Sequence, residues 1–287
     1  MKIMDFGERF KLYLRSSALG AAELADEDSI ADIYIKWLAE PADFLDGQSP
    51  QAYFAQMGAH ELVNTMLDYI RHCVMLPDPL LDALAESAEA EPLLFGVLTG
   101  EFGSFDNASQ LMSARINAAQ LLNQRQSMRT PDTYITIVCS REYKDALADI
   151  AAQGLANMGA AVADKLMAAL PGASVAGREC LLDMLADCSG DPNVARWIIG
   201  ELEAHPERLQ SYCEMLARFD YALVEAYDAV IAKLEDMMQS HLGYADYIAV
   251  KYAYESITGV PADEDFDYSE FDGDPDYERL KADRDEL

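Results

Sequence analysis

Hydrophobic residues recur at steps of three and four along most of the chain, the spacing that places them on one face of an α-helix. The clearest stripe, within residues 222–238, consists of Val224, Tyr227, Ile231, Leu234 and Met238. The segment after Pro50 carries another, formed by Leu62, Val63, Met66, Leu67, Ile70 and Val74. Proline and glycine separate such segments from one another. The pattern therefore predicts an all-α protein of many short helices.

A short motif returns at nearly even spacing between residues 115 and 259. Its successive copies are marked by Leu122, Leu155, Leu185 and Leu216, at offsets of 33, 30 and 31 residues. This period is typical of stacked pairs of antiparallel helices, an α-solenoid. The expected pairs are 108–126 with 131–140, 142–158 with 160–170, 176–188 with 192–204, and 207–219 with 222–238, before a closing helix at 244–258. Residues 134–138 have strand-like composition, but an isolated strand would have no partner, so we expect helix there.

The composition divides the chain into three parts. Residues 1–105 are predicted to form an N-terminal helical region that caps the repeats of residues 106–259, with a hinge at residues 100–106. Residues 262–287 hold twelve Asp or Glu against three Lys or Arg. Such a segment buries too little apolar surface to offset its ordering entropy, so residues 260–287 are predicted to be a partly disordered acidic tail. Four aromatic residues are expected to pin parts of it: Phe266, Tyr268, Phe271 and Tyr277.

Two stretches carry a family resemblance. The run Asp191-Pro192-Asn193-Val194-Ala195-Arg196 is similar to the Asp-Pro-x-Val-Arg turn of HEAT repeats, with the arginine one place late. The ending Ser256-Ile257-Thr258-Gly259 resembles the last helix of bacterial HEAT-like proteins. The other turns lack the Asp-Arg pair, so the repeats resemble a degenerate form of the family. The resemblance implies an α-solenoid that binds protein on an extended surface and that carries no catalytic residues.

The net charge of −30 changes the list of possible partners. A surface this acidic repels nucleic acid and anionic membranes and attracts basic segments, although the charge could also serve solubility alone. The sequence contains no apolar run near the ~18 residues of a membrane span. Its N-terminus shows no signal peptide, and its five cysteines fit buried reduced thiols. We therefore expect a cytoplasmic protein.

A local cluster of basic residues stands out against this acidity. It consists of Arg115, Arg125, Arg129, Arg141 and Lys144, whose span of sequence contains only two acids, Asp132 and Glu142. We name these five residues the basic island. The island could bind an anion, an acidic segment of a partner, or the protein's own tail. The alternative is a solvated face with local ion pairs.

Two stretches resemble metal-binding motifs, but each lacks residues that the motif requires. His60-Glu61-Leu62-Val63-Asn64 begins like the zinc motif His-Glu-x-x-His but ends in asparagine. A calcium loop starting at Asp272 would need glycine and glutamate where Tyr277 and Asp283 stand. We therefore predict no catalytic residue, metal site or cofactor.

Three functions remain open. The first is a non-enzymatic scaffold that binds a basic protein or peptide on its repeats. The second is a regulator or mimic whose acidic tail masks a basic or nucleic-acid-binding surface. The third is an enzyme with an unrecognised site, which would need a pocket with clustered titratable groups.

Overall fold

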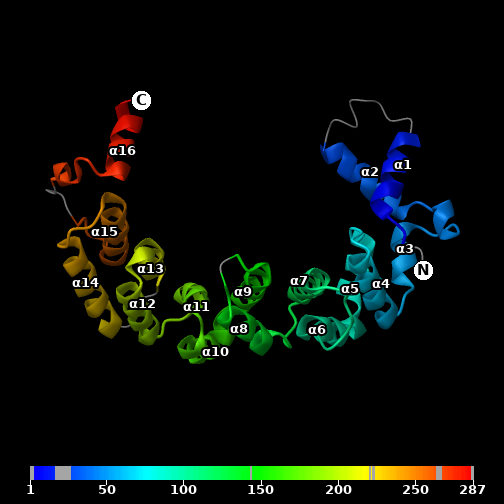
Figure 1. Ribbon diagram of the computed structural model, residues 1–287, viewed down its shortest axis with the longest axis horizontal. Helices are drawn as coiled ribbons and strands as arrows, with labels where there is room; N and C mark the ends of the chain where they lie inside the picture. The colour runs from blue at the N-terminus through cyan, green and yellow to red at the C-terminus, as the bar shows by residue number, and fades with distance from the viewer. Residues whose placement is uncertain are drawn as a thin grey trace. The chain divides into compact units, whose positions relative to one another are not determined.

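The protein is described by a computed structural model that covers residues 3–16, 27–142, 144–219, 221, 224–262 and 267–285. These residues form sixteen α-helices and six short 3-10 helices, with no strand among them (Figure 1). The α-helices are α1 (Phe6–Ser16), α2 (Glu27–Ala39), α3 (Pro50–Ala55), α4 (Ala59–Arg71), α5 (Asp78–Glu86), α6 (Glu91–Thr99), α7 (Ala108–Gln124), α8 (Pro131–Cys139), α9 (Ala146–Met158), α10 (Ala163–Ala169), α11 (Val175–Cys188), α12 (Pro192–Ala204), α13 (Leu209–Arg218), α14 (Val224–Met238), α15 (Tyr244–Thr258) and α16 (Pro275–Asp285). The 3-10 helices are η1 (Asp43–Leu45), η2 (Ala88–Ala90), η3 (Gly159–Val162), η4 (Leu170–Gly172), η5 (Pro206–Arg208) and η6 (Tyr268–Phe271). The prediction of an all-α protein is confirmed.

The chain forms two compact units. The first contains Met1–Tyr134 and Asp145–Gly154, and the second contains Ile135–Lys144 and Leu155–Leu287. The boundary falls within α8 and α9 and does not coincide with the hinge expected at residues 100–106. That segment instead forms the turn between α6 and α7, which pack against each other inside the first unit. Gly100 ends α6 in a left-handed conformation, with φ of 81°, which glycine adopts without strain.

Aromatic side chains fill the N-terminal part of the first unit. The Phe6 ring of α1 lies 6.3 Å from Trp37 of α2 and 5.3 Å from Phe54 of α3, measured between centroids. The Tyr69 hydroxyl of α4 donates to the Met4 carbonyl at 2.6 Å and so ties the start of the chain to this core. Edge-to-face and tilted ring pairs of this kind add to the stabilisation gained from apolar burial.

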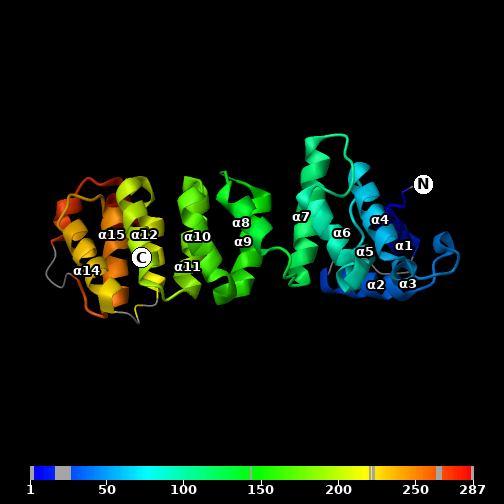
Figure 2. The same cartoon turned by 90° about the horizontal axis from the view of Figure 1, so that it is seen from below.

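Two layers of helices make up the second unit (Figures 1 and 2). One layer contains α11, α13 and α15, and α13 contacts both of the others. The other layer contains α10, α12 and α14, with α12 in contact with α14. Helix α12 also packs on α11 and α13, and α14 packs on α15. Each layer therefore covers the apolar face of the other. Helix α16 packs on α15, and the rest of the outer face of α11, α13 and α15 can form surface sites.

Local sequence signals explain where several helices begin. The Ser49 hydroxyl accepts from the Ala52 N–H at 3.2 Å, and Pro50 occupies the first turn of α3. In the same way Asp191 caps α12 by accepting from the Asn193 N–H at 2.9 Å. Such caps satisfy backbone donors that the first turn of a helix leaves unpaired.

The tail contains more structure than its composition predicted. Its described part forms η6 and α16. Phe271 is only 8% exposed, because its ring centroid lies 5.4 Å from that of Tyr244 and 5.2 Å from that of Tyr247. Tyr277 contacts Tyr244 at 5.0 Å, while Phe266 lies outside the described residues. The Tyr268 ring lies 6.4 Å from the Tyr247 ring, measured between centroids. The expected pinning by Tyr268, Phe271 and Tyr277 is therefore present.

A carboxylate of the tail also caps the helix on which the tail docks. Oδ2 of Asp274 accepts from the Tyr244 N–H, the first residue of α15, at 3.1 Å. This hydrogen bond holds the pKa of the Asp274 carboxyl below its usual value. The neighbouring N-cap residue, Gly243, has no side chain with which to cap α15, so the tail supplies the missing acceptor.

We expect Phe271→Ala to release the tail without unfolding the rest of the chain. Removing a nearly buried phenylalanine costs about 3 kcal/mol, which would raise the population of the undocked tail by roughly 100-fold. Limited proteolysis with a glutamate-specific protease measures this as faster cleavage at Glu270 and Glu278. The control is Val260→Ala, because Val260 is 55% exposed in the preceding segment. Equal cleavage rates for both variants and the parent would contradict the anchoring role.

Candidate functional site

Three residues of the basic island serve structural roles in the first unit. Arg115 donates through Nε to the Leu98 carbonyl at 2.8 Å, near the end of α6. A guanidinium nitrogen of Arg125 donates to the carbonyls of Leu84 and Ala85, in the last turn of α5. Nε of Arg129 lies 3.7 Å from Oε1 of Glu91, the first residue of α6. These cations satisfy carbonyls and charges at helix ends.

The other two island residues, Arg141 and Lys144, belong to the second unit. They lie between α8 and α9, where the Arg141 carbonyl accepts from the Ser174 hydroxyl at 2.8 Å. One guanidinium nitrogen of Arg141 is 3.7 Å from the Cys180 sulfur. Lys144 is exposed and has a φ of 62°, a conformation uncommon outside glycine. The five predicted residues are thus divided between the two units.

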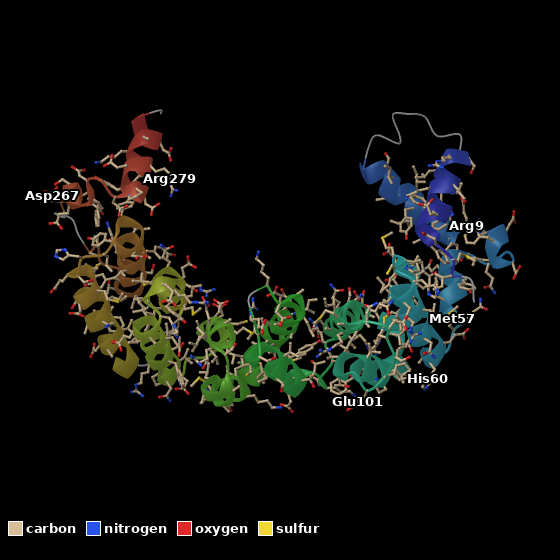
Figure 3. All side chains as sticks on the ribbon, in the orientation of Figure 1. Arg9, Met57, His60, Glu101, Asp267 and Arg279 are labelled. Carbon is tan, nitrogen blue, oxygen red and sulfur yellow. The ribbon has the colours of Figure 1, made fainter. Side chains whose placement is uncertain are left out.

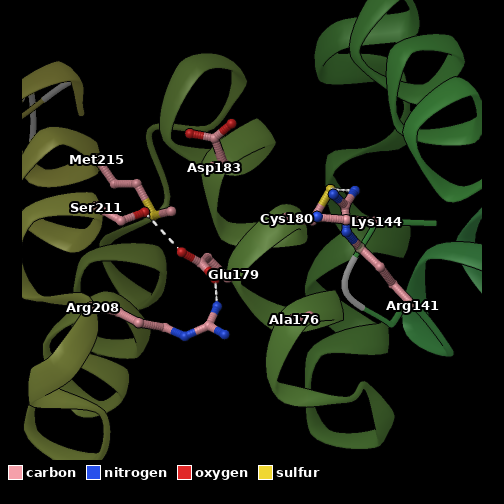
Figure 4. A pocket seen from close by; sticks show the side chains of 9 residues that line it. All are labelled: Arg141, Lys144, Ala176, Glu179, Cys180, Asp183, Arg208, Ser211 and Met215. Atoms are coloured by element: carbon pink, nitrogen blue, oxygen red, sulfur yellow. Dashed lines mark hydrogen bonds and ion pairs between the residues drawn. The ribbon is translucent and has the colours of Figure 1, made fainter. Parts of the chain in front are cut away.

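Arg141 and Lys144 line a pocket of about 400 Å³, here named the polar pocket (Figure 4). One face of α11 contributes Ala176, Glu179, Cys180 and Asp183, whose spacing of three and four residues places them in a row. The facing wall consists of Arg208, Ser211 and Met215, from the end of η5 and from α13.

The charges of the polar pocket pair with one another across the helices. Glu179 forms an ion pair with Arg208 and accepts from the Ser211 hydroxyl at 2.9 Å (Figure 4). Asp183 forms an ion pair with Arg218 of α13, which also lies 3.5 Å from Asp187. The hydroxyl of Ser211 therefore faces a carboxylate already held by an arginine. This arrangement fastens α11 to α13 and offers no histidine among the lining residues to act as a base.

A second hollow of about 540 Å³, here named the apolar groove, lies on α13, α15 and α16. Its floor on α15 consists of Tyr244, Ala245, Ile248, Ala249 and Tyr252. Helix α16 adds Leu280, while the polar edges consist of Gln210, Glu214, Asp276, Arg279 and Asp283. Arg279 is labelled on α16 in Figure 3.

Helix α15 carries apolar residues on two faces. One face, with Tyr247, Val250 and Ala253, is buried against the neighbouring helices. The other face forms the groove floor, where Tyr252 remains 59% exposed; across the groove Leu280 is 38% exposed. An apolar face of a helix is expected to be covered, and the second apolar face of α15 is covered only in part.

The rim of the apolar groove is acidic. Glu214 comes from α13, and Asp276 and Asp283 come from α16. The one cation among the lining residues, Arg279, lies 3.2 Å from Oδ1 of Asp276 and so neutralises one of the three carboxylates. The sequence predicted residues 244–258 only as a closing helix, without assigning its apolar faces, so this groove was missed. The apolar pattern on both faces of residues 244–258 was the available signal.

The described part of the chain holds neither a cluster of metal ligands nor a helix able to span a membrane. Its His, Cys, Asp and Glu side chains include no group of three or more placed to hold a metal ion. None of its helices has the length and apolar character needed to cross a membrane.

Comparison with known proteins adds no relative. The chain matches no model of a protein family, no curated protein and no solved structure.

Proposed function

We propose that this protein is a non-enzymatic scaffold that binds a basic protein or peptide on the surface of its helical repeats. The observation that carries the proposal is the apolar groove with its acidic rim, in a chain of net charge −30. Exposed apolar surface bordered by charge is typical of protein interaction sites. Complementary charge speeds association and selects the partner more than it adds affinity.

The arrangement of the repeats supports an α-solenoid of the HEAT-like kind as the scaffold. The four marker leucines fall in α7, α9, α11 and α13, one in each of four alternate helices, and each is at most 1% exposed. They are Leu122, Leu155, Leu185 and Leu216. Within the second unit, α11, α13 and α15 form one layer, as the helices on one side of a solenoid do. That layer carries both the polar pocket and the apolar groove.

The cysteines support placing this scaffold in the cytoplasm. All five are free thiols, but only Cys213 is buried; Cys139, Cys180 and Cys188 are partly buried and Cys73 is exposed, which corrects the expectation of five buried thiols. Burial raises the pKa of the Cys213 thiol to about 12, and Asp246 and Glu214 act in the same direction, so this sulfur stays protonated and inert. Cysteines that remain free thiols are typical of a reducing compartment.

Binding of labelled lysine- and arginine-rich peptides to the full chain tests the proposed function. Fluorescence anisotropy should show saturable binding that weakens by about tenfold or more between about 0.05 and 0.5 M salt. The matched control is each peptide with glutamate in place of its basic residues, which should not bind. Absence of binding at low salt for all basic peptides would contradict the proposal, and binding that ignores salt would contradict its electrostatic part.

The ordered tail favours a second candidate, a regulator that masks a basic surface of a nucleic-acid-binding protein. The aromatic anchors of η6 hold α16 in place while Asp272, Glu278 and Asp283 stay exposed to solvent. Lys281 pairs with Asp272 and Glu278 and offsets part of this charge. An anchored row of carboxylates can imitate a phosphate backbone. In that case DNA should compete with this protein for a basic partner, and replacing the exposed tail carboxylates by their amides should abolish the competition. Undiminished competition by the amide variants would rule this candidate out.

A further inference from the structure

We propose that the apolar groove binds one amphipathic, basic α-helix of a partner protein, with the apolar stripe of that helix on α15 and its lysines or arginines at the rim. This inference rests on the proposed function and narrows it to one site and one class of ligand. Helix-in-groove binding of this kind uses apolar anchors spaced at i, i+3, i+4 and i+7.

The shape of the floor favours a helix. Ala245 and Ala249 stand one turn apart between the larger side chains of Tyr244, Ile248 and Tyr252. Small side chains at this spacing leave depressions about 6 Å apart along α15. Anchors of an incoming helix, which are also one turn apart, can enter such depressions as ridges pack into grooves.

The walls of the groove define the charge of the ligand. Glu214 stands on α13 and Asp283 on α16, so carboxylates flank the floor on both sides, while the third carboxylate, Asp276, is paired with Arg279. Asp276 and Asp283 are seven residues apart, about 10.5 Å along α16. A ligand helix that carries cations on both edges of its apolar stripe would meet both walls. A second copy of this chain is disfavoured because it would bring the same acidic rim and a net charge of −30.

Two fluorescein-labelled peptides of about 18 residues, roughly five turns, provide the probe. The first places leucines at i, i+3, i+4 and i+7 with lysines on both edges. The second has the same composition, scrambled so that its leucines share no face. Anisotropy with the full chain should show the amphipathic peptide binding at least about tenfold more tightly than the scrambled one.

Groove variants then locate the site. Ala249→Trp fills the floor without changing charge and should weaken the amphipathic peptide by about tenfold or more, whereas Ala232→Trp, at an exposed position of α14 outside the groove, should not. Tyr252→Ser gives an independent test at a position exposed enough to be tolerated, and it should also weaken binding. Asp283→Lys should weaken binding more than Glu270→Lys, which lies outside the groove.

The outcomes separate this inference from the proposed function. If Ala249→Trp and Tyr252→Ser both bind the amphipathic peptide like the parent, or if the scrambled peptide binds equally well, the groove is not the helix site, although a basic-peptide scaffold survives. If neither peptide binds, both proposals fail.

Saturable binding of Nile red without peptide binding would show a small-molecule pocket. A dimer that Ala249→Trp dissociates would show a second copy in the groove. Either result overturns this inference.

Discussion

Replacing Arg178 by methionine is expected to destabilise the second unit by about 3–5 kcal/mol. Nε of Arg178 lies 2.8 Å from Oε1 of Glu201, and the same guanidinium donates to the Ala173 carbonyl at 2.7 Å. Glu201 is only 6% exposed, and no described residue donates a hydrogen bond to its Oε2 atom. Without the arginine, this carboxylate would remain buried with no permanent positive charge beside it. Nε2 of His205 lies 3.7 Å from Oε2 of Glu201, but the imidazole carries charge only when protonated.

Urea unfolding followed by circular dichroism measures this loss, with two controls. In the double variant Arg178→Met/Glu201→Leu the buried charge is absent, so most of the stability should return. Lys36→Met removes an exposed ion pair, in which Nζ lies 3.8 Å from Oε1 of Glu40, and should cost less than about 1 kcal/mol. A loss below about 1 kcal/mol for Arg178→Met would show that Glu201 is hydrated in solution.

Gly177→Ala is expected to destabilise the protein by about 1–3 kcal/mol, although alanine is the better helix former by about 1 kcal/mol. Gly177 lies in the first turn of α11, against the end of α8. A Cβ atom there would stand 2.6 Å from the Val138 carbonyl oxygen and 3.0 Å from that of Cys139. Both oxygens belong to the backbone, so α11 and α8 would have to separate.

Gly200 provides the matched control in the next helix. It is exposed in α12, and a Cβ atom there would meet nothing within 4 Å. Gly200→Ala should therefore stabilise the protein by about 0.5–1 kcal/mol, so the same substitution should have opposite signs at the two positions. Thermal and urea unfolding of the two variants measure the signs. Stabilisation by Gly177→Ala would mean that the helices are not in close contact.

Local signals were sufficient for much of the fold. Periodic apolar positions predicted most of the helices between residues 108 and 258 to within a few residues, since an amphipathic helix repeats its pattern every turn or two. Helix was also the right choice for residues 134–138. The Tyr134 ring is fully buried, and its hydroxyl donates to the Ala119 carbonyl at 3.1 Å.

Long-range contacts account for what the sequence concealed. The partner of Arg125 is the end of α5, about 40 positions earlier in the chain, and no spacing rule connects a side chain with carbonyls so far away. The tail was expected to be partly disordered because its charge outweighs its apolar content. Phe271 adds apolar burial that the composition of the tail did not reveal, because its ring packs on Tyr244 and Tyr247. The same docking places α16 beside α15 and thereby forms the groove, which residues 244–258 alone could not specify.

Hydrogen–deuterium exchange of the full chain with the basic amphipathic peptide tests the central claim most directly. Exchange in α13, α15 and α16 should be slower with saturating amphipathic peptide than without it, and the scrambled peptide should give no such protection. Protection confined to helices outside the groove would move recognition to another surface. Unchanged exchange throughout the chain would contradict the claim that this acidic helical protein binds a basic segment.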